Sequence, residues 1–165
     1  MILLDTEVVW ELRGGKAGRS DPAVVAWAQA QPRTGMFVSA LSLAEFASAA
    51  GQIERSDKAA AAAIRRWADG AVIAAFDGRV LSVDGAVARR AGSLAYPAMR
   101  DGLVAATALE HGLTLATRRP ADFRSGKVRL VNPWGYAPDA AEEEMDWRQL
   151  SRGGPVWLKS LFVRG

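Results

Sequence analysis

Residues 101–123 read DGLVAATALEHGLTLATRRPADF, and this stretch holds the pattern that decides the fold. Asp101 to His111 predicts a helix, and Gly112 stands just after it, where glycine readily adopts a left-handed backbone. Residues 113–116 then predict a short buried strand, and Asp122 follows that strand. A helix that leads directly into an apolar strand is the repeating unit of α/β proteins.

The same alternation of short apolar strands with helices continues along the chain as far as residue 137. The other predicted strands are residues 2–4, 36–38, 79–83 and 128–131. The other predicted helices are one ending at Leu12 and those at residues 22–31, 43–50, 56–76 (with a break at Gly70) and 85–95. This pattern predicts an α/β three-layer sandwich, in which helices cover both faces of a central, mostly parallel sheet.

The chain has 165 residues, half of them hydrophobic, which is enough for one domain with a core and too few for two. We expect residues 1–137 to form this domain and residues 138–165 to form a C-terminal extension. The extension begins acidic and ends with the apolar residues Trp157, Leu158, Leu161 and Phe162 among basic ones. It is interpreted either as a surface appendage, as is common near chain ends, or as a segment that packs on the domain or on a second subunit.

The composition excludes several kinds of site. The chain has no cysteine and a single histidine, His111, so disulfides, thiolate metal sites and sites built on two histidines are ruled out. No apolar run is long enough to cross a membrane, and the N-terminus lacks the basic start of a signal peptide. We therefore expect a cytoplasmic protein that does not enter the membrane.

The charge of the chain is compatible with nucleic-acid binding. The formal net charge is +3, and 17 of the 21 basic residues are arginine. Arginine presents a planar set of donors that matches phosphate oxygens. A genome that prefers arginine codons would explain the same composition equally well, so the charge permits RNA binding without requiring it.

Four acidic residues are predicted to meet at one edge of the sheet. Asp5, Glu45 and Asp122 follow the first, second and fourth strands, and Asp101 begins the helix that leads into the fourth. Two carboxylates about 4 Å apart repel by roughly 4 kcal/mol near a protein surface, so such a cluster needs a cation. Oxygen donors favour Mg²⁺ or Mn²⁺, and ions of this kind support the hydrolysis of phosphodiesters by water.

Each of these acids also has a purely structural interpretation. Asp5 and Asp101 are favourable charges near helix N-termini. Glu45 stands three residues after Ser42, in the spacing of a capping box, and Asp122 suits the start of a turn after Pro120. Only the joint placement of the four acids at one sheet edge favours function.

Four blocks of the sequence resemble PIN-domain ribonuclease toxins, and in particular the VapC-like branch of toxin–antitoxin pairs. The blocks are ILLDTEVVWEL (residues 2–12), SALSLAEFASA (39–49), the stretch at 101–123, and LVNPW (130–134). They occur in the order that is usual in the family. The resemblance implies a Mg²⁺-dependent endoribonuclease with a parallel sheet between helices, usually a homodimer and inhibited by a cognate antitoxin protein.

The resemblance also assigns roles to residues. It implies that Asp5 and Asp101 are the principal metal ligands, and that Glu45 and Asp122 complete the acidic pocket directly or through water. Thr6 and Thr117 would lie beside the acids as hydroxyl partners. His111 matches a position that is structural in the family, consistent with a residue that caps the end of a helix.

The chain departs from the family pattern at several places. Glu7 and Arg119 both stand where asparagine is usual, and we consider that Glu7 either points to solvent or balances the charge of Arg119. The stretch 84–101 is short and contains Pro97, and the tail is long. These departures keep open an alternative, a catalytically impaired PIN-fold module that binds RNA or an antitoxin. A further alternative is a phosphatase of the haloacid-dehalogenase type, which the stretch from Asp5 to Glu7 matches only in part.

Overall fold

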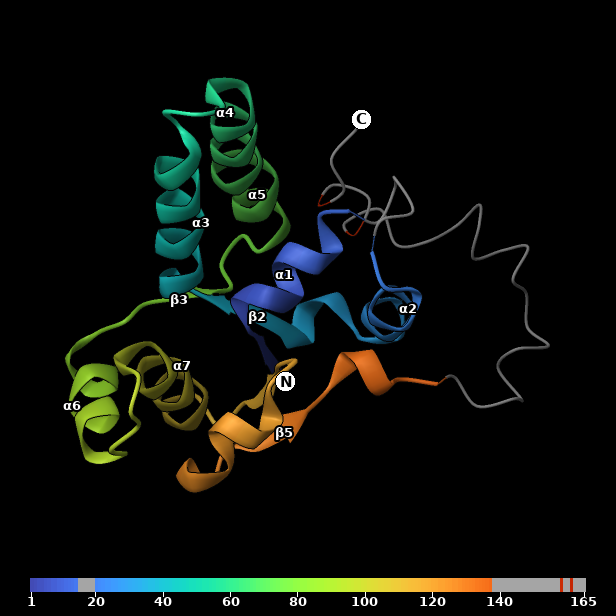
Figure 1. Cartoon of the computed structure of the whole chain (residues 1–165). Coiled ribbons are helices and arrows are strands. Elements are labelled where there is room, and N and C mark those ends of the chain that lie inside the picture. Colours follow the sequence, from blue (N-terminus) through green and yellow to red (C-terminus); the bar gives the residue numbers. More distant parts are fainter. Residues whose placement is uncertain (15–19, 138–157, 159–160, 162–165) are drawn as a thin grey trace.

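The computed structural model describes residues 1–14 and 20–137 together with Leu158 and Leu161 (Figure 1). Within these described ranges, none of the helices is both long and apolar enough to cross a bilayer. The expected sandwich is present. Its sheet has five strands in the order β3-β2-β1-β4-β5, and every neighbouring pair is parallel.

The strands are short and close to the predicted positions. Their bounds are β1 Ile2–Leu4, β2 Met36–Ser39, β3 Val80–Leu81, β4 Thr114–Ala116 and β5 Arg129–Val131. The third strand is shorter than the predicted 79–83, and it pairs with β2 alone at one edge of the sheet. Central β1 lies between β2 and β4, so the chain crosses over to opposite sides of β1, and loops at such a switch point open a crevice.

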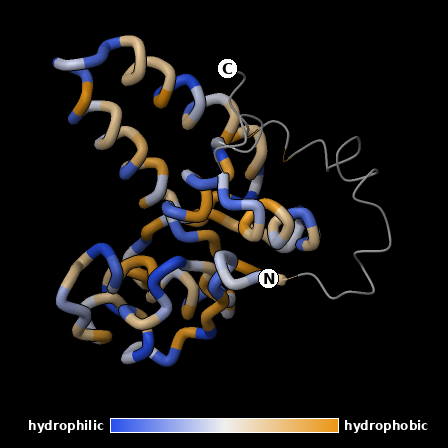
Figure 2. Tube along the Cα trace, turned by 45° about the vertical axis from the view of Figure 1, so that its right-hand side comes forward, coloured by the Kyte–Doolittle hydropathy of each residue, from blue (hydrophilic) through white to orange (hydrophobic). Residues whose placement is uncertain are grey.

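Helices cover both faces of the sheet, as Figure 1 shows. The longer ones are α1 Thr6–Leu12, α2 Pro22–Ala30, α3 Ala40–Ile53, α4 Lys58–Arg66, α6 Gly85–Ser93 and α7 Met99–Glu110. A π-helical segment, Trp67–Val72, and α5 Ile73–Ala75 continue α4, and 3-10 turns span Arg33–Gly35, Pro120–Gly126 and Pro133–Gly135. The hairpin of α3 and α4 projects away from the sheet (Figure 2).

Successive residues of β1 supply two separate cores, because strand side chains alternate between faces. Leu4 belongs to the larger core, with residues of α1, α2, α3 and α4 such as Val9 and Phe46. Leu3 belongs to the core on the other face, with Val104 of α7 and Phe123. The two cores establish the three layers that the sequence predicts.

Two helices begin earlier than predicted, and this changes the interpretation of two acids. Ser39 caps α3 by accepting a hydrogen bond from the Leu41 N–H at 3.2 Å, so α3 begins at Ala40 rather than Leu43. The predicted capping box of Ser42 and Glu45 is therefore wrong, since both residues lie inside the helix. Helix α7 begins at Met99, which places Asp101 in its first turn.

The remaining helix boundaries follow from backbone chemistry. Near Gly70, where the sequence predicted a break, the helix instead continues through the π-helical segment with a wider turn. Helix α6 ends at Ser93, before the predicted Ala95, and Ala95 itself has a φ of 52°. Gly112 has a φ of 62° after α7, as predicted.

Part of the C-terminal extension packs on the body of the protein. Leu158 and Leu161 are only 1% and 0% exposed and belong to the larger core. The indole N–H of Trp67 donates a hydrogen bond of 2.7 Å to the carbonyl of Leu161. The second interpretation of the extension therefore holds for these two residues, while Trp157 and Phe162 lie outside the described residues.

Candidate active site

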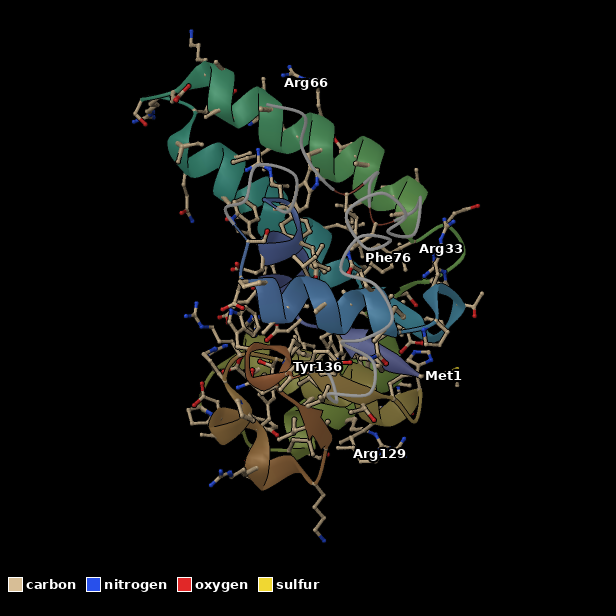
Figure 3. The ribbon with its side chains drawn as sticks, turned by 90° about the vertical axis from the view of Figure 1, so that its right-hand side faces the viewer. Met1, Arg33, Arg66, Phe76, Arg129 and Tyr136 are labelled. Atoms are coloured by element: carbon tan, nitrogen blue, oxygen red, sulfur yellow. The ribbon has the colours of Figure 1, made fainter. Side chains whose placement is uncertain are left out.

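The predicted acids lie at the edge of the sheet where the strands end. Asp5 directly follows β1, is 1% exposed, and caps α1 by accepting the Thr6 N–H at 2.8 Å. Glu45 lies in the second turn of α3, and Asp101 in the first turn of α7. Met1, Arg33 and Arg129, labelled in Figure 3, lie near the residues at which strands β1, β2 and β5 begin.

Arg100 lies between three of these acids. Its guanidinium donates from Nη2 to Asp5 Oδ1, from Nε to Glu45 Oε1 at 2.8 Å, and from Nη1 to Asp101 Oδ1 at 3.0 Å. Asp5, Glu45 and Asp101 thus converge on one point although they come from three parts of the chain. Carboxylates bound to one guanidinium share a single compact site.

Arg119 joins the fourth acid to this cluster. It contacts Asp101 Oδ1 at 3.2 Å and Asp122 Oδ2 at 2.8 Å, and its Nε lies 3.2 Å from Glu7 Oε1. The proposed balance between Glu7 and Arg119 is therefore present. Asp122 is exposed, so it lies at the rim of the acidic site rather than at its centre.

Two threonine hydroxyls hold the acids in place, as the resemblance implied. The fully buried Thr117 donates to Asp5 Oδ2 at 2.8 Å. The Thr6 hydroxyl contacts Glu45 Oε2 and lies 2.8 Å from the Ser42 hydroxyl.

His111 lies away from the acidic site. It is ten residues from Asp101 along α7, about 15 Å at the rise of a helix, and it occupies the C-cap position of that helix. Its predicted structural role agrees with this position.

The site remains strongly negative after these pairings. Five carboxylates share two guanidinium groups, which leaves an excess of three negative charges. Burial alone would lower the pKa of Arg100, but the hydrogen bond that Arg100 donates to Glu45 and the charge of Asp5 raise the pKa above its ordinary value. The pKa of Arg119 shifts for the same reasons. Burial alone would lower it, but the charges of Asp101 and Glu7 raise it above its ordinary value.

A cavity of about 300 Å³ opens beside the acids. Thr6, Glu7 and Glu45 line it on the side of the acidic site, and Trp10, Phe46 and Trp134 contribute aromatic surface. Two acids of the site, Glu7 and Glu45, therefore border a space that has room for a bound molecule.

The donor chemistry of the site fits a hard divalent ion, because carboxylate and hydroxyl oxygens are the ligands that Mg²⁺ and Mn²⁺ prefer. Among the described residues, however, the side chains are not arranged as a ready-made ion site. Among residues 1–14 and 20–137, no three acidic or histidine side chains are placed to share one ion directly. Arg100 lies between the acids instead.

The importance of Arg100 was not predicted from the sequence. It directly precedes Asp101 in the sequence, but adjacency to a predicted metal ligand does not by itself indicate that the two side chains pair. Arg119, considered from the sequence as a charge partner of Glu7, also contacts Asp101 and Asp122.

Comparison with known proteins defines the class to which this fold and site belong. Residues 2–125 match the PIN domain family, and the chain belongs to that family. It is 32% identical over 142 residues to the VapC ribonuclease Y4jK of Sinorhizobium fredii, covering 81% of this chain and 98% of the relative. It is likewise 32% identical to Toxin FitB of Neisseria gonorrhoeae, covering 81% and 99%.

Solved structures place the chain further, in the branch of VapC and FitB toxins. The FitAcB structure from Neisseria gonorrhoeae has a TM-score of 0.72 and 29% identity, covering 82% of this chain and 99% of that one. The structure of FitAB bound to a DNA fragment has a TM-score of 0.71 at 30% identity, with 83% and 98% covered. A toxin–antitoxin complex from Klebsiella pneumoniae, 20% identical with a TM-score of 0.59, shares the fold.

Proposed function

We propose that this protein is a Mg²⁺-dependent endoribonuclease that hydrolyses RNA phosphodiester bonds as the toxin of a toxin–antitoxin pair. The convergence of Asp5, Glu45 and Asp101 on one guanidinium carries the proposal. Membership of the VapC and FitB branch supports it independently. The protein would act in the cytoplasm, where its RNA substrate is found.

The chain's own residues have distinct parts in this proposal. Asp5 and Asp101 would hold Mg²⁺, or Mn²⁺ in its place, with Glu45 and Asp122 completing the pocket. The bound ion would supply charge neutralisation for the phosphodiester under attack. Thr117 fixes the orientation of Asp5, and Thr6 that of Glu45. Glu45, which is half-buried beside the cavity, would accept a proton from an attacking water.

Structures similar to this chain are toxin–antitoxin complexes, so we propose a cognate antitoxin protein as a partner. We also propose a homodimer as the toxin's own state, on the resemblance to VapC-like toxins alone. Light scattering of the purified chain, alone and with the antitoxin, tests both. The excess of arginine gives the surface donors for RNA phosphates.

One observation favours a second candidate function, a catalytically impaired PIN-fold module that binds RNA or an antitoxin. Arg100 and Arg119 together neutralise part of the acidic cluster. In such a module the acids and arginines would serve as a fixed network rather than as a site for chemistry.

Cleavage of RNA by the purified chain with Mg²⁺ separates the two candidates. We expect Asp5→Asn to lower the cleavage rate by roughly 10²- to 10³-fold, because a central carboxylate loses its charge. Asn remains a good helix cap, so α1 keeps its start. Asp69→Asn, in the exposed part of the π-helical segment, is the matched control and should cleave like the wild type. Equal and negligible cleavage by wild type and Asp5→Asn would favour the binding module.

A further inference from the structure

The guanidinium of Arg100 is divided among acids from both helical layers. Glu45 comes from α3 on one face of the sheet, Asp101 from α7 on the other, and Asp5 from the loop after central β1. All three guanidinium nitrogens have a partner. Nε donates to Glu45 at 2.8 Å, Nη1 donates to Asp101 at 3.0 Å, and Nη2 contacts Asp5. Arg100 is thus the cation around which the acids assemble in this structure.

The two oxygens that matter most for an ion are both taken by this side chain. Asp5 Oδ1 contacts Nη2, and Asp101 Oδ1 contacts Nη1, so one guanidinium bridges the two principal acids. The other oxygen of Asp5 is already occupied by the Thr117 hydroxyl. Mg²⁺ binds carboxylate oxygens at about 2.1 Å, so an ion shared by Asp5 and Asp101 needs the space that these nitrogens fill.

Arg100 cannot vacate this space by losing its charge. Arginine stays protonated in proteins, and three carboxylates contact this guanidinium. It can leave by moving, because it is the second residue of α7 and its side chain is 24% exposed. Asp101 would keep its contact with Arg119 at 3.2 Å when Arg100 departs.

We propose that Arg100 is a built-in competitor of the divalent ion and sets the affinity of the acidic site for it. The guanidinium and the ion occupy the site in turn, so the ion binds only when Arg100 releases Asp5 and Asp101. The inference rests on the proposed function insofar as a divalent ion is required there. It makes Arg100 an affinity-determining residue, distinct from the acids that would hold the ion.

Titration of the full chain with Mn²⁺, followed by electron paramagnetic resonance of the free ion, tests the competition without an activity measurement. Arg100→Gln keeps a polar side chain but removes the charge, and we expect it to bind Mn²⁺ about tenfold more tightly, or better, since one charged competitor is lost. Arg100→Lys keeps the charge as a single ammonium and should fall between the two. Arg65→Gln is the matched control, because Arg65 forms a similar two-pronged pair with Glu54 on the exposed surface.

Thermal unfolding with and without Mn²⁺ is a second measurement of ion binding, and it can be used even if Arg100→Gln is less stable than the wild type. Without metal, this variant should melt below the wild type, because Asp5 is buried without its cation. Added Mn²⁺ should raise its melting temperature by more than it raises that of the wild type. Unchanged or weaker Mn²⁺ binding by both Arg100 variants would overturn the inference.

The ribonuclease assay keeps this inference distinct from the proposed function. If the wild type cleaves RNA with Mg²⁺ while Arg100→Gln binds Mn²⁺ no better, the competition is refuted and the nuclease stands. If Arg100→Gln binds Mn²⁺ more tightly and the wild type does not cleave, the competition stands and the nuclease fails. If no variant binds Mn²⁺ and no cleavage occurs, both are refuted.

Discussion

Asp5 is the residue on which the site depends most, because it is a charged side chain placed almost wholly out of solvent. A buried carboxylate is tolerated only when hydrogen bonds and opposite charge replace water. Thr117, the Thr6 N–H and Arg100 meet this need from three directions. The network explains why a threonine directly follows β4, where its hydroxyl reaches the acid after β1.

Replacement of Thr117 by valine tests this network. Thr117→Val removes the donor to Asp5 Oδ2 while keeping the shape of the side chain, so we expect the free energy of unfolding to fall by about 1–3 kcal/mol. Urea denaturation measures it. Thr107→Val is the control, since Thr107 is also fully buried but donates to the Leu103 carbonyl inside α7. Losses of the same size in both variants would contradict a special role for Thr117.

The acids of the site could be predicted from the sequence, whereas the cation between them could not. Asp5, Glu45 and Asp122 each follow a predicted strand, and strand ends in a parallel sheet share one edge. The contacts of Arg100 depend on how its long, flexible side chain extends from α7 to Glu45 of α3 and to Asp5 after β1. No spacing in the sequence encodes that direction, so only the three-dimensional arrangement identifies it.

At the scale of elements, the early start of α7 decides where Asp101 lies. This helix leads into β4, so it runs opposite to the strands and its N-terminus lies at the edge where the strands end. Asp101 in the first turn benefits from the positive end of the helix dipole. The structural interpretation of Asp101 and the functional one are therefore compatible.

The C-terminal extension contributes an element-scale prediction. Leu161 is 0% exposed and packs in the larger core, where its carbonyl also accepts the Trp67 indole N–H. Leu161→Ala should lower the free energy of unfolding by about 2–5 kcal/mol through the cavity it leaves. Ile73→Ala, at a position that is 40% exposed, is the control and should cost far less. A loss no greater than that of the control would show that the extension does not stabilise the body.

Element types were easier to predict than element boundaries. The strands and helices around residues 101–123 agree closely because apolar periodicity, Gly112 and the acids mark them together. The start of α3 was missed because Ser39 and Ser42 both suit a helix cap, and only the backbone shows that Ser39 is the one used. The packing of Leu158 and Leu161 depends on a long-range contact with Trp67, which local pattern does not reveal.

At the scale of the whole molecule, the sheet order explains why the acids come together. The chain passes from β1 to β2 on one side and reaches β4 on the other, so helices of both layers end or begin beside the carboxyl end of β1. Glu45 and Asp101 reach the site from opposite layers for this reason. The position agrees with the rule that ligands bind where the strand order reverses.

Removal and return of the divalent ion tests the central claim of shared carboxylates most directly. RNA fragments released by the wild-type chain are measured with Mg²⁺, after chelation with EDTA, and after Mg²⁺ is added back in excess. We expect cleavage to be lost with EDTA and restored by Mg²⁺, because the acids act through the ion that they bind. Cleavage that continues undiminished in EDTA, or that never occurs at any Mg²⁺ concentration, would contradict a metal-dependent ribonuclease site at Asp5, Glu45 and Asp101.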